Sequence, residues 1–243
     1  MTPLPHDSAR LAWWVTAWLR GHASPDDLLE AVLAGDAAHD VAPLEGGDVV
    51  PLVLALGAWR RAGAVSAGLA MPVPGHPAGL GGPSEFNGAA LTRGEAVVLE
   101  GAGLGLVPHR AGSGVVWQTY PAARRPLADL GEADRGLRLT LPQAADALAA
   151  LDVARWRPEV ADELMSLHRA PSYDAPPGTH ARAVDLAGRA SQALAIVDLA
   201  LEDHGAAVTA HEIAAREAAL APLARAGRVA LVAACSAEVW PPS

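Results

Sequence analysis

The chain contains no lysine, because all 18 basic residues among its 243 positions are arginines. A P-loop nucleotide site, a pyridoxal-phosphate Schiff base and a protein-kinase active site each depend on a lysine side chain. The sequence therefore excludes these three kinds of site.

Cysteine is almost as scarce, since Cys235 is the only one. One cysteine cannot form a disulfide within the chain or supply a four-cysteine zinc or iron–sulfur site. The nine histidines show no metal-ligand spacing. His211 and Glu212 resemble the start of an HExxH motif, but Ala215 stands where its second histidine would be. We therefore predict no metal site and no cofactor.

Positive charge is also in short supply, because the formal net charge is −9 and the isoelectric point is about 5.4. An acidic chain has no overall positive field that attracts nucleic acid or anionic membranes. The longest apolar run, Val49 to Trp59, is shorter than the roughly 20 residues of a membrane span and contains Pro51. The sequence predicts a cytoplasmic protein that binds no membrane, and its charge disfavours nucleic-acid binding, although local arginine clusters could still bind phosphates.

Three helices are predicted before residue 64. Apolar residues recur at helical spacing over 11–19, where Trp14 and Trp18 share one face. Ser24 followed by Pro25 and two aspartates is a typical helix start. A third apolar pattern runs from 49 to about 61, and we expect residues 1–7 to form a loose tail and 36–48 a loop.

The stretch 71–122 holds the strongest local signals of the chain. Glycine and proline turns over 74–83 lead into a helix that we expect from Pro83 to Arg93, with Gly82 as its cap. Short apolar runs separated by glycines then predict three strands in an antiparallel meander. The predicted strands cover 96–100, 104–110 and 115–122.

Phe86 and Asn87 are the only phenylalanine and the only asparagine in the chain, and they are neighbours. One interpretation is structural, with Phe86 anchoring the helix start and Asn87 satisfying nearby backbone groups. The other is functional, with a cluster that offers an acid or base and an oxyanion donor at one end of the sheet. The spacing does not establish whether His76 and His109 meet. The candidate ligand-binding residues are His76, Glu85, Asn87, His109 and Arg110.

Beyond the meander the sequence predicts a short strand over 137–139 and a capping box from Thr140 to Gln143. A further helix is expected to open at Pro158 and to end near Arg169. Three prolines in 171–178 mark the predicted linker between a mixed domain, 1–170, and a helical domain, 179–243.

The last domain is alanine-rich and reads as two antiparallel helices. Its first helix carries small and apolar residues at alternating steps of four and three, the spacing of a helix-pairing seam. The sequence leaves open whether the hairpin packs within the chain or against another subunit. The seam residues are Ala183, Ala187, Ala190, Leu194, Val197 and Leu201.

The predicted fold is α+β, with a small, mostly antiparallel sheet, flanking helices and a C-terminal helical hairpin. Because no catalytic motif is complete, the first hypothesis is a non-catalytic binding or protein-interaction module that associates with itself or a protein partner through 179–237 or the first helix. The second is a small-molecule-binding enzyme or sensor that uses loop 74–87 and His109. The third is DNA binding through 208–228, which resembles a helix-turn-helix without its turn glycine or a basic recognition helix.

Overall fold

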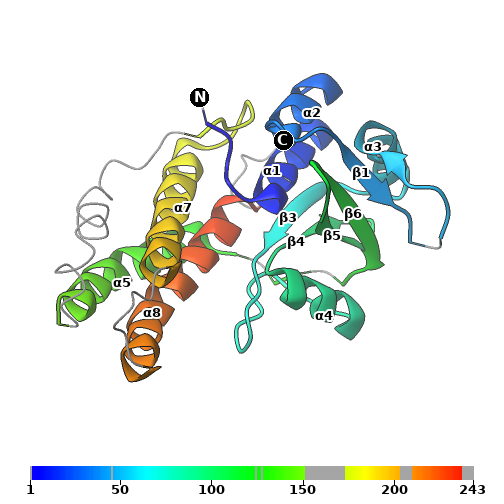
Figure 1. The fold of residues 1–243 in the computed structure, drawn as a ribbon. Coiled ribbons are helices and arrows are strands. Elements are labelled where there is room, and N and C mark those ends of the chain that lie inside the picture. Colours follow the sequence, from blue (N-terminus) through cyan, green and yellow to red (C-terminus); the bar gives the residue numbers. More distant parts are fainter. Residues whose placement is uncertain are drawn as a thin grey trace.

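The computed structural model describes residues 2–44, 46–123, 125–126, 128–150, 173–202 and 210–236. Its elements form two halves (Figure 1), a sheet half containing all strands with helices α1 to α4, and a helical half containing α5, α7 and α8. The α+β fold and the C-terminal helical pair are thus as predicted. No helix within these residues is both long enough and apolar enough to cross a bilayer.

The sheet has six strands in the order β2-β1-β6-β5-β4-β3. Its centre is the predicted antiparallel meander of β4, β5 and β6, with β3 added antiparallel to β4. β1 pairs in parallel with β6, so the sheet is mixed and larger than predicted. The strands are β1 (His39–Ala42), β2 (Val50–Pro51), β3 (Ser66–Ala70), β4 (Ala96–Glu100), β5 (Leu104–Ala111) and β6 (Gly114–Pro121).

β1 contradicts the prediction of a loop over 36–48. The strand is only four residues long, and its sequence HDVA holds one large apolar side chain, so it carries no readable alternation. What holds it is the pairing with β6 more than 70 residues away, which places His39 opposite Val115. A strand stabilised by such a distant partner leaves little local signal.

The first three helices follow the predictions closely. α1 (Asp7–Leu19) packs across β3, and α2 (Pro25–Leu33) begins with the predicted cap, where Ser24 and Asp27 exchange hydrogen bonds. α3 (Leu52–Arg61) ends with two arginines that complement the helix dipole. Trp13 and Trp18 of α1 are buried in the interior, and Trp14 is half-buried against the core.

α4 (Ser84–Arg93) covers the opposite face of the sheet from α1 and starts one residue later than predicted. Phe86 is completely buried there and lies beside Tyr120, with ring centroids 6.2 Å apart. A Cβ atom on Gly105 would lie 2.4 Å from the Phe86 ring, so this position accepts only glycine. The phenylalanine therefore acts as the anchor of α4 on the sheet.

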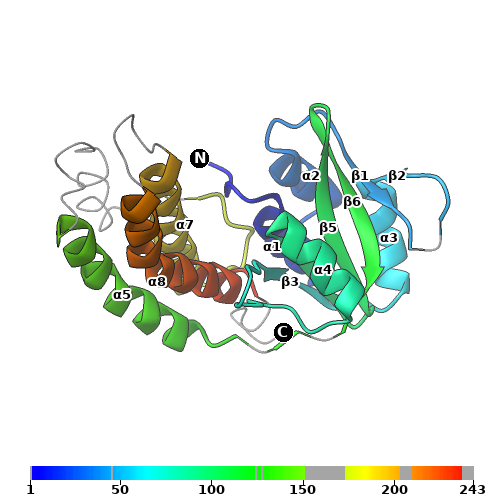
Figure 2. The same ribbon diagram turned by 60° about the horizontal axis from the view of Figure 1, so that its bottom comes forward.

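The helical half consists of α5 (Leu130–Ala150), α7 (Ala181–Glu202) and α8 (Ala210–Ala234). The predicted seam of α7 is buried against α8 within the chain, and Gly227 lets α8 approach the backbone of Ala190. Figure 2 shows that α8 changes direction along its length, as expected for a helix that contains Pro222.

α5 overturns two predictions made for this region. Residues 137–139 are helical, with Leu137 fully buried and Leu139 68% exposed. Thr140 does not cap a helix, because its hydroxyl donates to the Gly136 carbonyl inside α5. Three residues of alternating character fit a strand or a helix equally well, and contact with α8 decides the outcome. The helix predicted over 158–169 lies outside the described residues.

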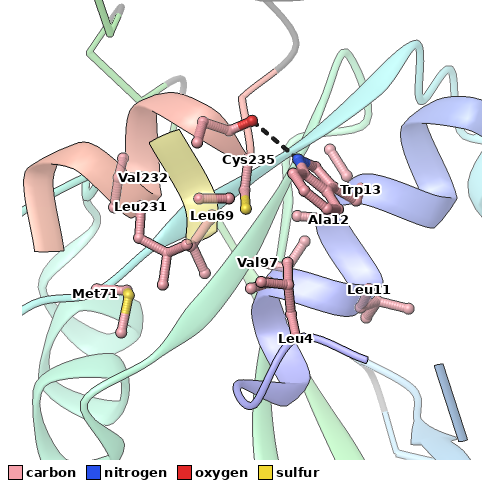
Figure 3. Packing of buried hydrophobic residues seen from close by; sticks show 14 of the residues in the cluster. Leu4, Leu11, Ala12, Trp13, Leu69, Met71, Val97, Leu231, Val232 and Cys235 are labelled. Atoms are coloured by element: carbon pink, nitrogen blue, oxygen red, sulfur yellow. Dashed lines mark hydrogen bonds between the residues drawn. The ribbon is translucent and has the colours of Figure 1, made fainter. Parts of the chain in front are cut away.

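The two halves share one apolar core, where α1, β3 and α8 meet (Figure 3). The Trp13 indole N–H donates to the Ala234 carbonyl at 2.9 Å, across 221 residues of sequence. Leu4 joins this core with 1% exposure, so the predicted loose tail over residues 1–7 is wrong. Arg10 holds the tail in place by donating to the Leu4 and Pro5 carbonyls.

Candidate functional site

The rare pair Phe86 and Asn87 has a structural role in this fold. The Asn87 Oδ1 atom accepts a hydrogen bond from the Gly82 backbone N–H at 3.1 Å, which ties the glycine loop to the first turn of α4. Glu85 also lies in that first turn, where a carboxylate complements the helix dipole. The Asn87 hydrogen bond and the burial of Phe86 agree with the structural interpretation of the pair. Ligand binding by Glu85 and Asn87 stays a prediction.

Arg110 lies in a second cluster, at the end of β5 beside the start of α1. Its guanidinium pairs with Asp7 at 3.0 Å and with Asp36 at 2.6 Å. Asp7 also binds the buried Arg10, and Asp36 binds the His39 ring. Hydrogen bonds from His39 and Arg110 outweigh desolvation and hold the pKa of Asp36 below its ordinary value. We call these five residues the ion-pair network.

Asp7, Asp36 and His39 are close enough for their ligand atoms to share a metal ion, since these atoms lie within 4.8 Å of one another. The hydrogen bonds argue for a different use. The Trp117 indole N–H donates to His39 Nδ1 at 3.2 Å, so the ring proton is on Nε2, where it is donated to Asp36. A metal at Nε2 would require the other tautomer, with two N–H groups facing each other. Arg10 and Arg110 already pair with these carboxylates and neutralise their charge.

His109 and Arg110 are adjacent on β5 and therefore project to opposite faces of the sheet. Arg110 lies on the α1 face, with the ion-pair network, and His109 is exposed on the α4 face. His76 belongs to a third location, described below. The structure thus distributes the five predicted site residues over three places instead of one cluster.

His76 is fixed by a tight turn that extends from β3. Val73 and His76 exchange both backbone hydrogen bonds, at 3.0 and 2.8 Å, around Pro74 and Gly75. Proline followed by a glycine with φ of 78° is the sequence that a type II turn requires. The turn holds the His76 ring against the helical half.

His76 lines a pocket of about 720 Å³ between the two halves, which we call the junction pocket. One wall is the turn after β3, the second is the start of α5 with the segment before it, and the third is α8. A volume of this size is typical of small-molecule sites. Its lining residues are His76, Ala78, Gly79, Pro126, Ala128, Asp129, Glu132, Ala133, Gly136, Thr140, Ala218, Ala221, Pro222, Arg225, Ala226, Val229, Val232 and Ala233.

The junction pocket contains polar groups that the fold does not satisfy. His76 Nδ1 is shielded from solvent and has no hydrogen-bond partner among the described residues. Burial, followed by repulsion from Arg225 and Arg228, lowers the pKa of His76. Asp129 is already engaged, because its carboxylate accepts from the Glu132 backbone N–H at 2.7 Å at the start of α5.

Sequence reasoning identified His76 but missed Arg225 and Glu132 as its neighbours in this pocket. Neither Glu132 nor Arg225 belongs to a recognisable motif in the sequence. No pattern joined them, because the pocket forms only when α5 and α8 pack beside the turn at His76. Such long-range contacts leave no spacing signal in one sequence.

Residues 8–130 match the family model described as Rv1486c-like protein, N-terminal domain, and residues 131–232 match its C-terminal domain. The boundary between these models falls at the first turn of α5, whereas the sequence placed the domain boundary at 171–178. Four curated relatives match.

One relative is the uncharacterised protein Rv1486c of Mycobacterium tuberculosis strain ATCC 25618 / H37Rv, which is 29% identical over 68% of this chain and 74% of the relative. Another is the uncharacterised protein ML1804 of Mycobacterium leprae strain TN, which is 27% identical over 96% of this chain and 98% of the relative. No solved structure matches the chain.

Proposed function

The chain belongs to the Rv1486c-like family, and we propose that it is a non-catalytic binding protein that holds a small organic molecule in the junction pocket. The single observation that carries this proposal is the position of His76. A tight turn presents its ring to a pocket of small-molecule size, and one ring nitrogen has no partner among the described residues. Buried polar atoms without partners are rare in proteins and call for an explanation such as a ligand.

The composition of the pocket supports binding over catalysis. Most of its lining residues are alanine, glycine, proline or valine, which shape an apolar cavity. Thr140 is its one hydroxyl side chain, and that hydroxyl is already bonded to the Gly136 carbonyl. Nucleophilic catalysis needs a hydroxyl or thiol paired with a base, and the lining offers no such pair.

Protein association through 179–237 or the first helix stays a prediction, but its two motivating features are used inside the fold. The α7 seam is buried against α8, and Trp13 and Trp18 of α1 are buried in the core. Replacing Ala190 or Leu194 with glutamate would therefore unfold the hairpin instead of dissociating an oligomer. The mass of the wild-type protein in light scattering is the cleaner test, and a monomer would argue against self-association.

DNA binding through 208–228 has less support. The described part of that segment, from 210 onward, belongs to the single helix α8 and not to two helices joined by a turn. Arg216 is buried and donates to the Ala200 carbonyl, so it does not face a nucleic acid.

A blocked pocket tests the proposed function. Ala221 lines the pocket from an exposed position on α8, so Ala221→Trp fills the pocket without disturbing the core. Ala214 is exposed on the same helix outside the pocket, which makes Ala214→Trp the matched control. We would screen both variants and the wild type by thermal shift against a metabolite library.

A ligand at about 100 times its dissociation constant stabilises the folded state by about 2.7 kcal/mol. We expect such a ligand to raise the melting temperature of wild type and Ala214→Trp by several degrees, and of Ala221→Trp by much less. The proposal is wrong if no compound stabilises the wild type, or if every stabilising compound acts equally on Ala221→Trp.

A further inference from the structure

The junction pocket is positively charged on one side, although the chain as a whole carries a net charge of −9. His76 and Arg225 both line it, and Arg225 lies close enough to disfavour protonation of the histidine. Arg228, one turn further along α8, adds a second positive charge near His76. The positive charge is confined to the α8 wall, because Asp129 and Glu132 line the pocket from the α5 side.

Several arginines of this fold form ion pairs that hold its elements together, whereas Arg225 forms none among the described residues. Arg10 and Arg110 are engaged with Asp7, and Arg189 pairs with Asp134 at 2.7 Å. Arg225 is exposed and makes no ion pair or hydrogen bond within the described part of the chain. A guanidinium beside a cavity, without an internal partner, is available to bind a carboxylate or phosphate.

Two acidic side chains also line the pocket, from the segment before α5 and from α5 itself. Asp129 uses its carboxylate to cap α5, so its charge is partly satisfied by the Glu132 backbone N–H. Glu132 is exposed on the first turn of α5. These groups belong to the α5 wall, whereas Arg225 belongs to α8, so the pocket has chemically different sides.

We infer that the ligand of the junction pocket is an organic anion, whose carboxylate or phosphate group binds His76 and Arg225 and whose apolar body lies along the alanines of α5 and α8. This inference rests on the proposed function and names its ligand class. The apolar body follows from the lining, where Ala133, Ala221 and Ala226 offer surface and no hydrogen bonds.

Matched probes separate the charge of a ligand from its shape. Phenylacetate and phenyl phosphate carry the two anionic groups on an aromatic body, and phenylacetamide is the neutral analogue of the first. Isothermal titration at pH 7.5 would measure all three with the wild type, Arg225→Gln, His76→Gln and Ala221→Trp. Arg61→Gln is the control, since Arg61 is an exposed arginine on α3 and does not line the pocket.

We expect the wild type to bind at least one anion about tenfold or more tightly than phenylacetamide, as a charge-assisted hydrogen bond implies. Arg225→Gln should weaken the anion by a similar factor and leave the amide unchanged, while Arg61→Gln changes neither. Preference between the two anions identifies the head group as carboxylate or phosphate.

Each failure has its own signature. Equal binding of phenylacetate and phenylacetamide to the wild type, or an Arg225→Gln variant that binds anions normally, would overturn the anion inference. If one of these two results occurs but Ala221→Trp still abolishes binding, the anion inference fails and the proposed function stands. If Ala221→Trp binds every probe and every metabolite as tightly as the wild type, the proposed function itself fails.

Discussion

The ion-pair network and the junction pocket both gather charged side chains from distant parts of the chain, but they differ in how far those side chains satisfy one another. In the network, Asp7, Asp36 and His39 each have a partner, and the Asp7 side chain is only 4% exposed. In the pocket, a ring nitrogen of His76 and the guanidinium of Arg225 have no hydrogen-bond partner within the described residues. Complete pairing indicates a structural role, and incomplete pairing indicates a place for a ligand.

This difference corrects a natural first guess. The network has the richer chemistry, with a histidine between a carboxylate and an indole, and it looks more like an active site than the pocket does. Its hydrogen bonds are used within the fold, where Arg110 of β5 binds Asp7 of α1 and Asp36 before β1, and Trp117 of β6 binds His39 of β1. The pocket has few polar groups, but His76 Nδ1 and the Arg225 guanidinium have no partner among the described residues.

Removing one carboxylate from the network should have the largest effect. Asp7→Asn leaves the buried Arg10 without its closest partner, and breaking a buried ion pair on one side costs about 3 kcal/mol or more. We expect the free energy of unfolding in urea to fall by about that amount. Asp48→Asn, at an exposed loop position, should change it by less than about 0.5 kcal/mol. Equal stability of the two variants would show that the network contributes little to the fold.

A smaller effect is expected for the loop that leads to α4. Asn87→Ala removes the acceptor of the Gly82 N–H and should lower the free energy of unfolding by about 1 kcal/mol. Asn87→Asp keeps an acceptor oxygen and should lose less. Neither variant should alter ligand affinity in the junction pocket, because Asn87 does not line it. A large loss of affinity in Asn87→Ala with normal stability would restore the functional interpretation of the rare pair.

Local signals in the sequence predicted the elements that depend on local chemistry. The cap at Ser24, the helix over 84–93 and the meander were all readable, because turn residues and apolar periods are properties of neighbouring positions. The seam of α7 was readable too, since its period spans the whole helix. These predictions are confirmed by the structure.

The sequence could not predict the elements that distant contacts decide. β1 exists because β6 pairs with it, and residues 137–139 are helical because α5 packs on α8. The grouping of the candidate site residues was unreadable for the same reason: His109 and Arg110 are adjacent in sequence but face opposite sides of the sheet, whereas His76 and Arg225 are 149 positions apart and line one pocket. A single sequence shows which residues are unusual, not which of them meet.

The smallest predicted effect concerns pH and tests the unsatisfied histidine directly. In the free protein, burial and the nearby Arg225 and Arg228 lower the pKa of His76 below its ordinary value of about 6.5. Protonated His76 is therefore scarce at pH 7.5. A bound carboxylate supplies the opposite charge and raises this pKa, so anion binding takes up a proton.

The affinity for phenylacetate should then rise about threefold to tenfold as the pH falls from 7.5 to 5.5, while the ligand remains ionised. Asp129 and Glu132 are the acidic side chains that line the same pocket. His76→Gln should bind with no pH dependence, and His109→Gln, an exposed histidine outside the pocket, should behave as the wild type. If His109→Gln abolishes the pH dependence and His76→Gln keeps it, the anion lies at the end of β5, and the contrast between satisfied and unsatisfied clusters does not locate the ligand.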